Sequence, residues 1–152
     1  KRFEINYLNT FTSIRITDDL FSSKSLFLEE VCIMKDIIDI SMRGNPNLLI
    51  IDEIFKGTNT RERIASAQAI LQYLNKKGHI ILFSTHDLEL IDLLGQDFEV
   101  GYFSEEIDKE RIIFDYKIKI GKNYSTNAIR VLELNNYPKE IIENAYCNLK
   151  QN

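Results

Sequence analysis

The stretch Leu48-Leu49-Ile50-Ile51-Asp52-Glu53 joins four consecutive apolar residues to two acids. Such a run is typical of a strand that is buried on both faces in a parallel sheet covered by helices. Ligands of α/β proteins bind at the carboxyl ends of such strands, so both carboxylates are expected at a site. One carboxylate there can hold Mg²⁺, directly or through water, and the next can take a proton from an attacking water. A strand that merely ends in two solvated acids is the alternative.

The segments on either side alternate between strand and helix patterns. Residues 11–16 alternate apolar and polar side chains like a half-buried strand, and residues 25–42 repeat apolar side chains at helical spacing. Residues 61–75 carry a helical apolar stripe, and residues 79–83 form a second short apolar strand. The order strand, helix, strand, helix, strand predicts an α/β fold with a parallel sheet.

The last third of the chain follows a different pattern. Residues 98–103 and 111–119 alternate like two antiparallel strands, and the charged residues 105–110 are predicted to form the turn between them. Residues 123–134 and 138–149 are predicted helices, which form a hairpin at the tail.

Composition limits the possible functions. The chain has 152 residues, of which 44% are hydrophobic and 28% charged, as in one modest globular domain. The net charge of −4 argues against a surface that itself grips DNA. No apolar run approaches the roughly 18 residues that span a bilayer, and the first ten residues lack a signal-peptide core, so we expect no membrane contact and a cytoplasmic location.

His86 follows the second apolar strand, one helix after Asp52. A right-handed crossover places both strand ends at the same edge of the sheet. A histidine there can contact a γ-phosphate or hold an attacking water, although a lone histidine is more often structural. His79, at the other end of its strand, is interpreted as structural.

These features together resemble an ABC-type ATPase and, within that superfamily, the MutS family. Asp52-Glu53 is similar to a Walker B pair, the loop Gly57-Thr58-Asn59-Thr60 follows it, and Ser84-Thr85-His86 comes next. The other segments that carry the resemblance are Phe11-Thr12-Ser13-Ile14, Asp18-Asp19-Leu20, Ser22-Ser23-Lys24-Ser25-Leu26-Phe27 with Glu30, Asn123-Tyr124-Ser125, and Tyr137-Pro138-Lys139-Glu140-Ile141-Ile142. The order of these segments, over nearly the whole chain, is specific.

The resemblance implies a role for each matching residue, with ATP and Mg²⁺ as cofactors. Asp52 would be the Mg²⁺-site carboxylate, Glu53 the general base and His86 the γ-phosphate contact. Ser25 matches the signature serine, which in such ATPases reaches across a dimer to the partner's nucleotide; from the residues alone it is a helix cap. The loop Gly57, Thr58, Asn59 and Thr60 would line the same interface. The implied partners are a second copy of the chain and DNA, the latter held by other domains of the parent protein.

The implied fold is an ABC-type P-loop NTPase core without its Walker A segment. Residues 1–120 would form the C-terminal part of the ATPase domain, and residues 121–152 its helical dimerisation element. No Gly-x-x-x-x-Gly-Lys-[Ser/Thr] sequence occurs in the chain, so we expect it to be part of a longer protein and to be inactive alone. Phe55-Lys56, Ser23 and Leu26 depart from the family pattern and indicate a divergent MutS-like branch.

Two other functions fit parts of the pattern. A transporter ATPase would carry Leu-Ser-Gly-Gly-Gln before the Walker B strand, and a chromosome-maintenance ATPase would show long heptads; the sequence has neither. A non-catalytic dimerisation module would retain Asp52 and Glu53 as relics and use only its tail hairpin.

Overall fold

The computed structural model of the chain describes residues 4–5, 7–14, 26–44, 46–108, 111–124 and 127–150. The chain divides into two compact units, Lys1–Phe98 and Glu99–Asn152, and each is described by itself. The functional division between residues 120 and 121 stays a prediction.

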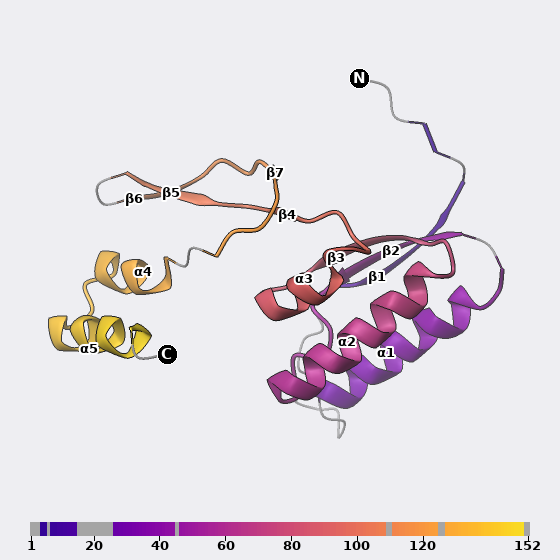
Figure 1. Cartoon of the computed structure of the whole chain (residues 1–152), viewed down its shortest axis with the longest axis horizontal. Helices are drawn as coiled ribbons and strands as arrows, with labels where there is room; N and C mark the ends of the chain where they lie inside the picture. Colours follow the sequence, from indigo (N-terminus) through magenta and orange to yellow (C-terminus); the bar gives the residue numbers. More distant parts are fainter. Residues whose placement is uncertain are drawn as a thin grey trace. The chain divides into compact units, whose positions relative to one another are not determined.

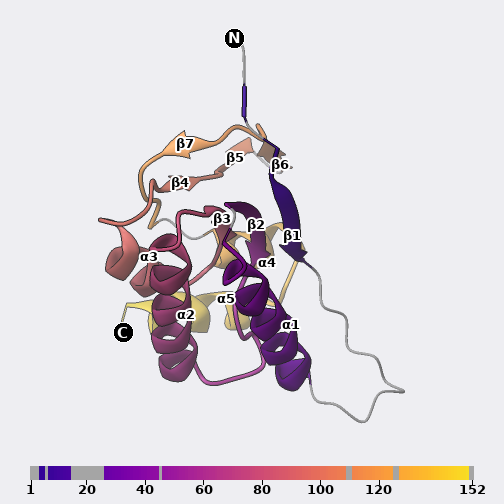
Figure 2. The same cartoon turned by 90° about the vertical axis from the view of Figure 1, so that its right-hand side faces the viewer.

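The first unit contains a three-stranded parallel sheet in the order β1-β2-β3, formed by β1 (Asn9–Ser13), β2 (Asn47–Asp52) and β3 (Ile80–Ser84). Helix α1 (Leu26–Ser41) connects β1 to β2, and α2 (Thr60–Asn75) connects β2 to β3. Both helices lie on the same face of the sheet (Figures 1 and 2). The predicted α/β fold with a parallel sheet is therefore confirmed, whereas its P-loop identity stays a prediction.

The core lies between this sheet and its helices. Leu49 and Ile51 of β2 point to the helical side and are almost fully buried. They pack with the other buried apolar residues, Met34, Ile37, Ile54, Phe55, Ile64, Ala67, Leu71, Leu74, Leu90 and Leu94. On the opposite face Leu48 and Ile50 are half-buried, and Leu82 of β3 is exposed. The prediction that β2 is buried on both faces was therefore wrong for the described residues, because α1 and α2 cover only one face.

A third helix, α3 (Leu88–Leu94), follows β3 directly and was not predicted. It packs beside α2 and buries Leu90 and Leu94 in the core. Two inward residues on a seven-residue helix leave too short a periodic signal for the sequence to reveal it.

The second unit begins with short antiparallel strands. β4 (Gly101–Tyr102) pairs with β7 (Lys119–Ile120), and β5 (Glu105–Asp108) pairs with β6 (Arg111–Phe114). Antiparallel strands were predicted here, but their pairing was only partly right: β4 pairs with β7 at the end of the predicted strand 111–119, whereas β6 pairs with β5, which was assigned to a turn. Its pairing with β6 uses backbone groups, so three acidic residues in the segment do not prevent a strand.

The tail forms the predicted helical hairpin. Helix α4 (Ala128–Leu134) packs against α5 (Lys139–Leu149), and Pro138 is the N-cap of α5. Helix α4 is shorter than predicted. None of the described helices combines the length and the apolar composition that a membrane span needs.

Candidate active site

The carboxyl ends of β2 and β3 lie side by side, which brings two of the polar segments together. Asp52 and Ser84 are direct partners in the parallel register. The Ser84 hydroxyl donates a hydrogen bond of 2.6 Å to Asp52 Oδ1. This edge of the sheet is where a parallel α/β fold places its ligand.

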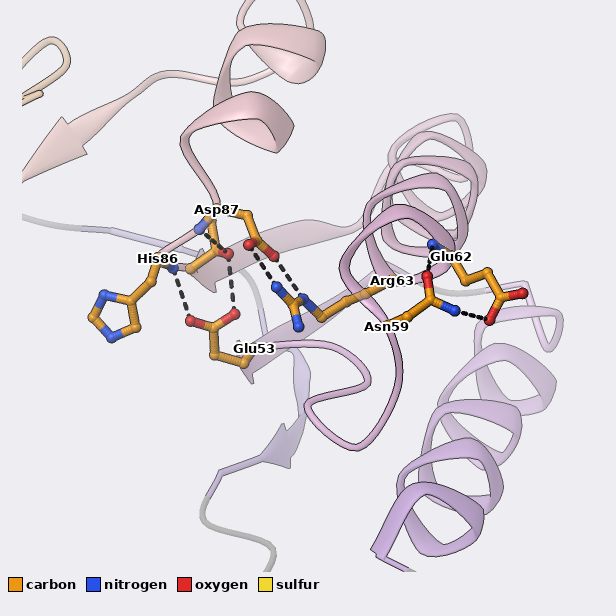
Figure 3. Close-up of polar contacts among 7 residues, drawn as sticks. Glu53, Asn59, Glu62, Arg63, His86 and Asp87 are labelled. Atoms are coloured by element: carbon orange, nitrogen blue, oxygen red, sulfur yellow. Dashed lines mark hydrogen bonds and ion pairs between the residues drawn. The ribbon is translucent and has the colours of Figure 1, made fainter. Parts of the chain in front are cut away.

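Glu53 has an unusual backbone conformation at this edge. Its φ of 63° lies in the left-handed region, which a residue other than glycine adopts only when its surroundings enforce it. The Glu53 amide donates to the Ser84 carbonyl at 3.0 Å. Its carboxylate accepts from the Thr85 hydroxyl at 3.0 Å and from the His86 amide at 2.8 Å (Figure 3). The amide and the carboxylate of Glu53 are therefore both hydrogen-bonded to residues at the end of β3 or directly after it.

Asp52 is partly open to solvent, and its side chain is 41% exposed. The hydrogen bond from Ser84 lowers the pKa of Asp52, desolvation opposes that shift, and the charges of Lys56 and His86 add to it. Lys56 Nζ lies 3.6 Å from Asp52 Oδ2. Asp52 is therefore ionised at neutral pH and accessible from solvent.

The oxygen ligands at Asp52 suit a Mg²⁺ ion whose shell is completed by water and phosphates. They do not suit a metal ion held by protein side chains alone. The described residues contain no group of three or more His, Cys, Asp or Glu side chains that could hold a metal ion. Mg²⁺ is usually bound by one or two carboxylates, with water and substrate phosphates completing its shell. One exposed carboxylate with the Ser84 hydroxyl beside it suits that arrangement.

The group of His86 that contacts the candidate site is its backbone amide. Its amide holds Glu53, whereas its imidazole is exposed and points away from the pair formed by Arg63 and Asp87 (Figure 3). His79 lies at the other end of β3, as predicted, and is buried. Its Nδ1 accepts from the Asn47 amide at 3.1 Å, and burial lowers its pKa, which suits a structural role.

The loop after Glu53 makes its contacts within the chain. Gly57 approaches the start of α1 so closely that an added Cβ would lie 3.0 Å from Phe27 Cβ. Asn59 caps α2, because its Oδ1 accepts from the Glu62 amide at 3.0 Å, and Thr60 is the first residue of that helix. Thr58 Oγ1 lies 3.5 Å from Glu62 Oε2. Ser25, the remaining predicted site residue, lies outside the described residues.

Sequence reasoning assigned no structural task to Glu30. This buried side chain of α1 is only 7% exposed, and its two oxygens accept from the Lys56 amide at 3.1 Å and the Gly57 amide at 3.3 Å. Glu30 thus ties α1 to the loop that follows the two acids. The sequence signal that could have revealed this contact is the position of Glu30, an acid on a mostly apolar face of its helix.

Sequence reasoning also missed an ion pair between α2 and the residue after His86. Arg63 Nε and Nη2 each donate to Asp87 at 2.8 Å (Figure 3). This contact lowers the pKa of Asp87 and raises that of Arg63. The pair joins residues far apart in the sequence, and no spacing rule predicts it.

Known proteins resemble this chain over most of its length. The family model described as MutS domain V matches residues 2–151. The DNA mismatch repair protein MutS of Listeria welshimeri is 35% identical over 144 residues, which cover 93% of this chain and 16% of that protein. The same protein of Carboxydothermus hydrogenoformans is 34% identical over 138 residues, covering 89% of this chain and 16% of the relative.

A human relative is similar to the same degree. MutS protein homolog 4 of Homo sapiens is 36% identical over 137 residues, which cover 82% of this chain and 14% of that protein. The chain thus spans about 16% of the length of the bacterial relatives that it matches. Because the family model extends over residues 2–151, the chain belongs to the MutS family.

Proposed function

We propose that this chain is part of the ATPase domain of a MutS-like DNA-repair protein, in which ATP binding closes a dimer and changes how other domains hold DNA. One observation carries the proposal. Asp52 and Glu53 follow one another at the carboxyl edge of the sheet, and both carboxylates are oriented by hydrogen bonds from the end of β3. Family membership supports it, because the bacterial relatives are named DNA mismatch repair proteins.

The proposed chemistry divides the two acids. Asp52, open and ionised, would hold Mg²⁺, which neutralises charge on the phosphate oxygens when it is bound. Glu53 would take one proton from the attacking water, and the resulting hydroxide would displace ADP from the γ-phosphorus. The exposed imidazole of His86 would contact the γ-phosphate. A carboxylate oxygen that accepts one hydrogen bond retains a second lone pair, so the bonds to Thr85 and His86 leave Glu53 able to act as a base.

The proposal extends to partners through the same family. Ser25 and the loop Gly57, Thr58, Asn59 and Thr60 would meet the nucleotide of a second copy, and the α4–α5 hairpin would strengthen that dimer. DNA would be bound by other domains of the parent protein. We expect the parent protein to be located in the cytoplasm.

Steady-state ATP hydrolysis by the full-length parent tests this function, with and without a mismatched duplex. The wild type should hydrolyse ATP at a rate that responds to the duplex. Glu53→Ala should be slower by roughly 10²–10⁴-fold, the usual contribution of a general base. Glu99→Ala, at an exposed acid outside the site, is the matched control. A wild-type rate of zero would instead favour a non-catalytic dimerisation module.

A further inference from the structure

Asp87 occupies a helix-capping position but does not use it. It is the N-cap of α3, with φ −81° and ψ 96°, yet its side chain makes no capping hydrogen bond. An aspartate at this position usually accepts from a backbone N–H in the first turn of its helix. Here its two oxygens accept instead from the Nε and Nη2 of Arg63 on α2. The Asp87 carboxylate therefore links the start of α3 to α2 instead of capping α3.

The same residue is connected to Glu53 through Thr85. The Asp87 amide donates to Thr85 Oγ1 at 3.1 Å, so the hydroxyl hydrogen of Thr85 is directed to Glu53 Oε2 at 3.0 Å. The neighbouring His86 amide donates to the other oxygen, Oε1. Asp87 therefore contacts one of the two groups that orient the Glu53 carboxylate, the Thr85 hydroxyl, and directly follows the other, His86, in the chain (Figure 3).

Arg63 provides a rigid anchor for Asp87. The side chains of Arg63 and Asp87 are only 20% and 15% exposed, unlike those of a solvated surface pair. A planar guanidinium that donates two parallel hydrogen bonds fixes both the distance and the rotation of its partner. The Arg63 amide also donates to the Asn59 carbonyl at 2.9 Å, within the capped first turn of α2. The Arg63 guanidinium therefore extends from a well-formed turn of α2.

We propose that Arg63 and Asp87 are positioning residues for Glu53: their ion pair fixes the Thr85–His86 turn and thereby aims the Glu53 carboxylate at the attacking water. This inference rests on the proposed ATPase function. It adds two residues that do not touch the substrate but on which the rate of proton transfer depends.

A double-mutant cycle in the full-length parent tests the inference, using Arg63→Met, Asp87→Asn and the two together. Nucleotide-binding stoichiometry is measured for each protein, and kcat is expressed per ATP-binding site, so that unfolded protein does not count. Asp39→Asn is the matched control, because it removes the same charge from an exposed ion pair, with Lys35, on α1. Arg63→Lys retains the charge but cannot form the planar two-bond contact.

We expect kcat to fall by roughly 10–100-fold in either single variant, the order of loss that a misplaced catalytic group causes, with KM for ATP unchanged. The double variant should lose no more than the worse single variant, since the pair acts as a unit. Arg63→Lys should recover only part of the loss, and Asp39→Asn should behave like the wild type.

Three results would overturn the inference while the proposed function stands: an active wild type with kcat equal in Asp87→Asn and Asp39→Asn, losses that add in the double variant, or a rise in KM alone. A wild-type parent that binds but does not hydrolyse ATP would instead overturn the proposed function and this inference with it. The two failures are therefore distinct.

Discussion

Glu53 is held in a backbone conformation that costs about 1–3 kcal/mol for a residue other than glycine. Three hydrogen bonds offset that cost, from its own amide to Ser84 and to its carboxylate from Thr85 and His86. Such conformations concentrate at functional sites, where the surrounding structure enforces them. At Glu53 the consequence is a carboxylate whose direction is fixed by the protein itself.

The ion pair between Arg63 and Asp87 makes the stability of the 152-residue chain depend on pH. Arg63 lowers the pKa of Asp87 in the folded chain, so this stabilisation is present above the unfolded pKa of about 3.9 and is lost as pH falls through the folded value. Asp87→Asn should lower the free energy of unfolding by about 1–3 kcal/mol at pH 7. Urea unfolding from pH 7 to pH 3 should show that difference shrinking below about pH 4.

Asp39→Asn is the control for this titration, because it breaks an exposed pair worth at most about 1 kcal/mol. If the difference between the wild type and Asp87→Asn stayed constant down to pH 3, the pair would not be the source of the acid sensitivity.

The sequence predicted the residues that stand at strand ends and missed those that support them. Asp52, Glu53 and His86 follow apolar runs, and parallel strands place such ends at one edge. The sequence could not show that the His86 amide would donate to Glu53, because every residue except proline carries a backbone N–H. Arg63 and Asp87 meet only because α2 and the end of β3 are adjacent in space.

At the scale of elements, Glu30 connects α1 to the loop after the two acids, and Glu30→Gln tests that connection. Glutamine has one acceptor oxygen and an NH₂ group that cannot accept, so the amide of Lys56 or Gly57 loses its partner. The free energy of unfolding should fall by about 1–3 kcal/mol. Hydrogen exchange at residues 55–58 should become faster.

Glu29→Gln is the matched control, one position away on the same helix. It should change the free energy of unfolding by less than about 1 kcal/mol, through the helix dipole alone, and leave exchange at residues 55–58 as it was. Equal exchange in the two variants would show that Glu30 does not hold the loop.

Elements were predictable where their apolar residues form a continuous run or recur at helical spacing. β2 is a continuous apolar run, and α2 buries Ile64, Ala67, Leu71 and Leu74 at helical spacing, so both were found. β5 consists mainly of acidic residues and pairs through its backbone, which leaves no pattern in the side chains.

At the scale of the whole molecule, the α4–α5 hairpin carries exposed apolar side chains that a second copy would cover in the proposed dimer. Ile141 is 48% exposed and Leu149 is 59% exposed. Ile141→Glu should weaken self-association of the parent by roughly 10–100-fold, as the loss of a central interface residue does. Sedimentation equilibrium measures the change, and deletion of residues 137–152 should act in the same direction.

Asn144→Glu is the control, because it adds the same charge at an exposed polar position of α5. A dimer that is unchanged in both Ile141→Glu and the deletion would show that the hairpin has another task.

The most direct test of the account is a Mg²⁺ titration of single-turnover ATP hydrolysis by the full-length parent, comparing the wild type with Asp52→Asn and Glu53→Gln. We predict that Asp52→Asn raises the Mg²⁺ concentration needed for half the maximal rate, since a metal ligand is lost. Glu53→Gln should leave that concentration unchanged and lower the rate at saturating Mg²⁺ by roughly 10²–10⁴-fold. A Glu53→Gln protein as fast as the wild type would contradict the assignment of Glu53 as the base and, with it, the account of this site.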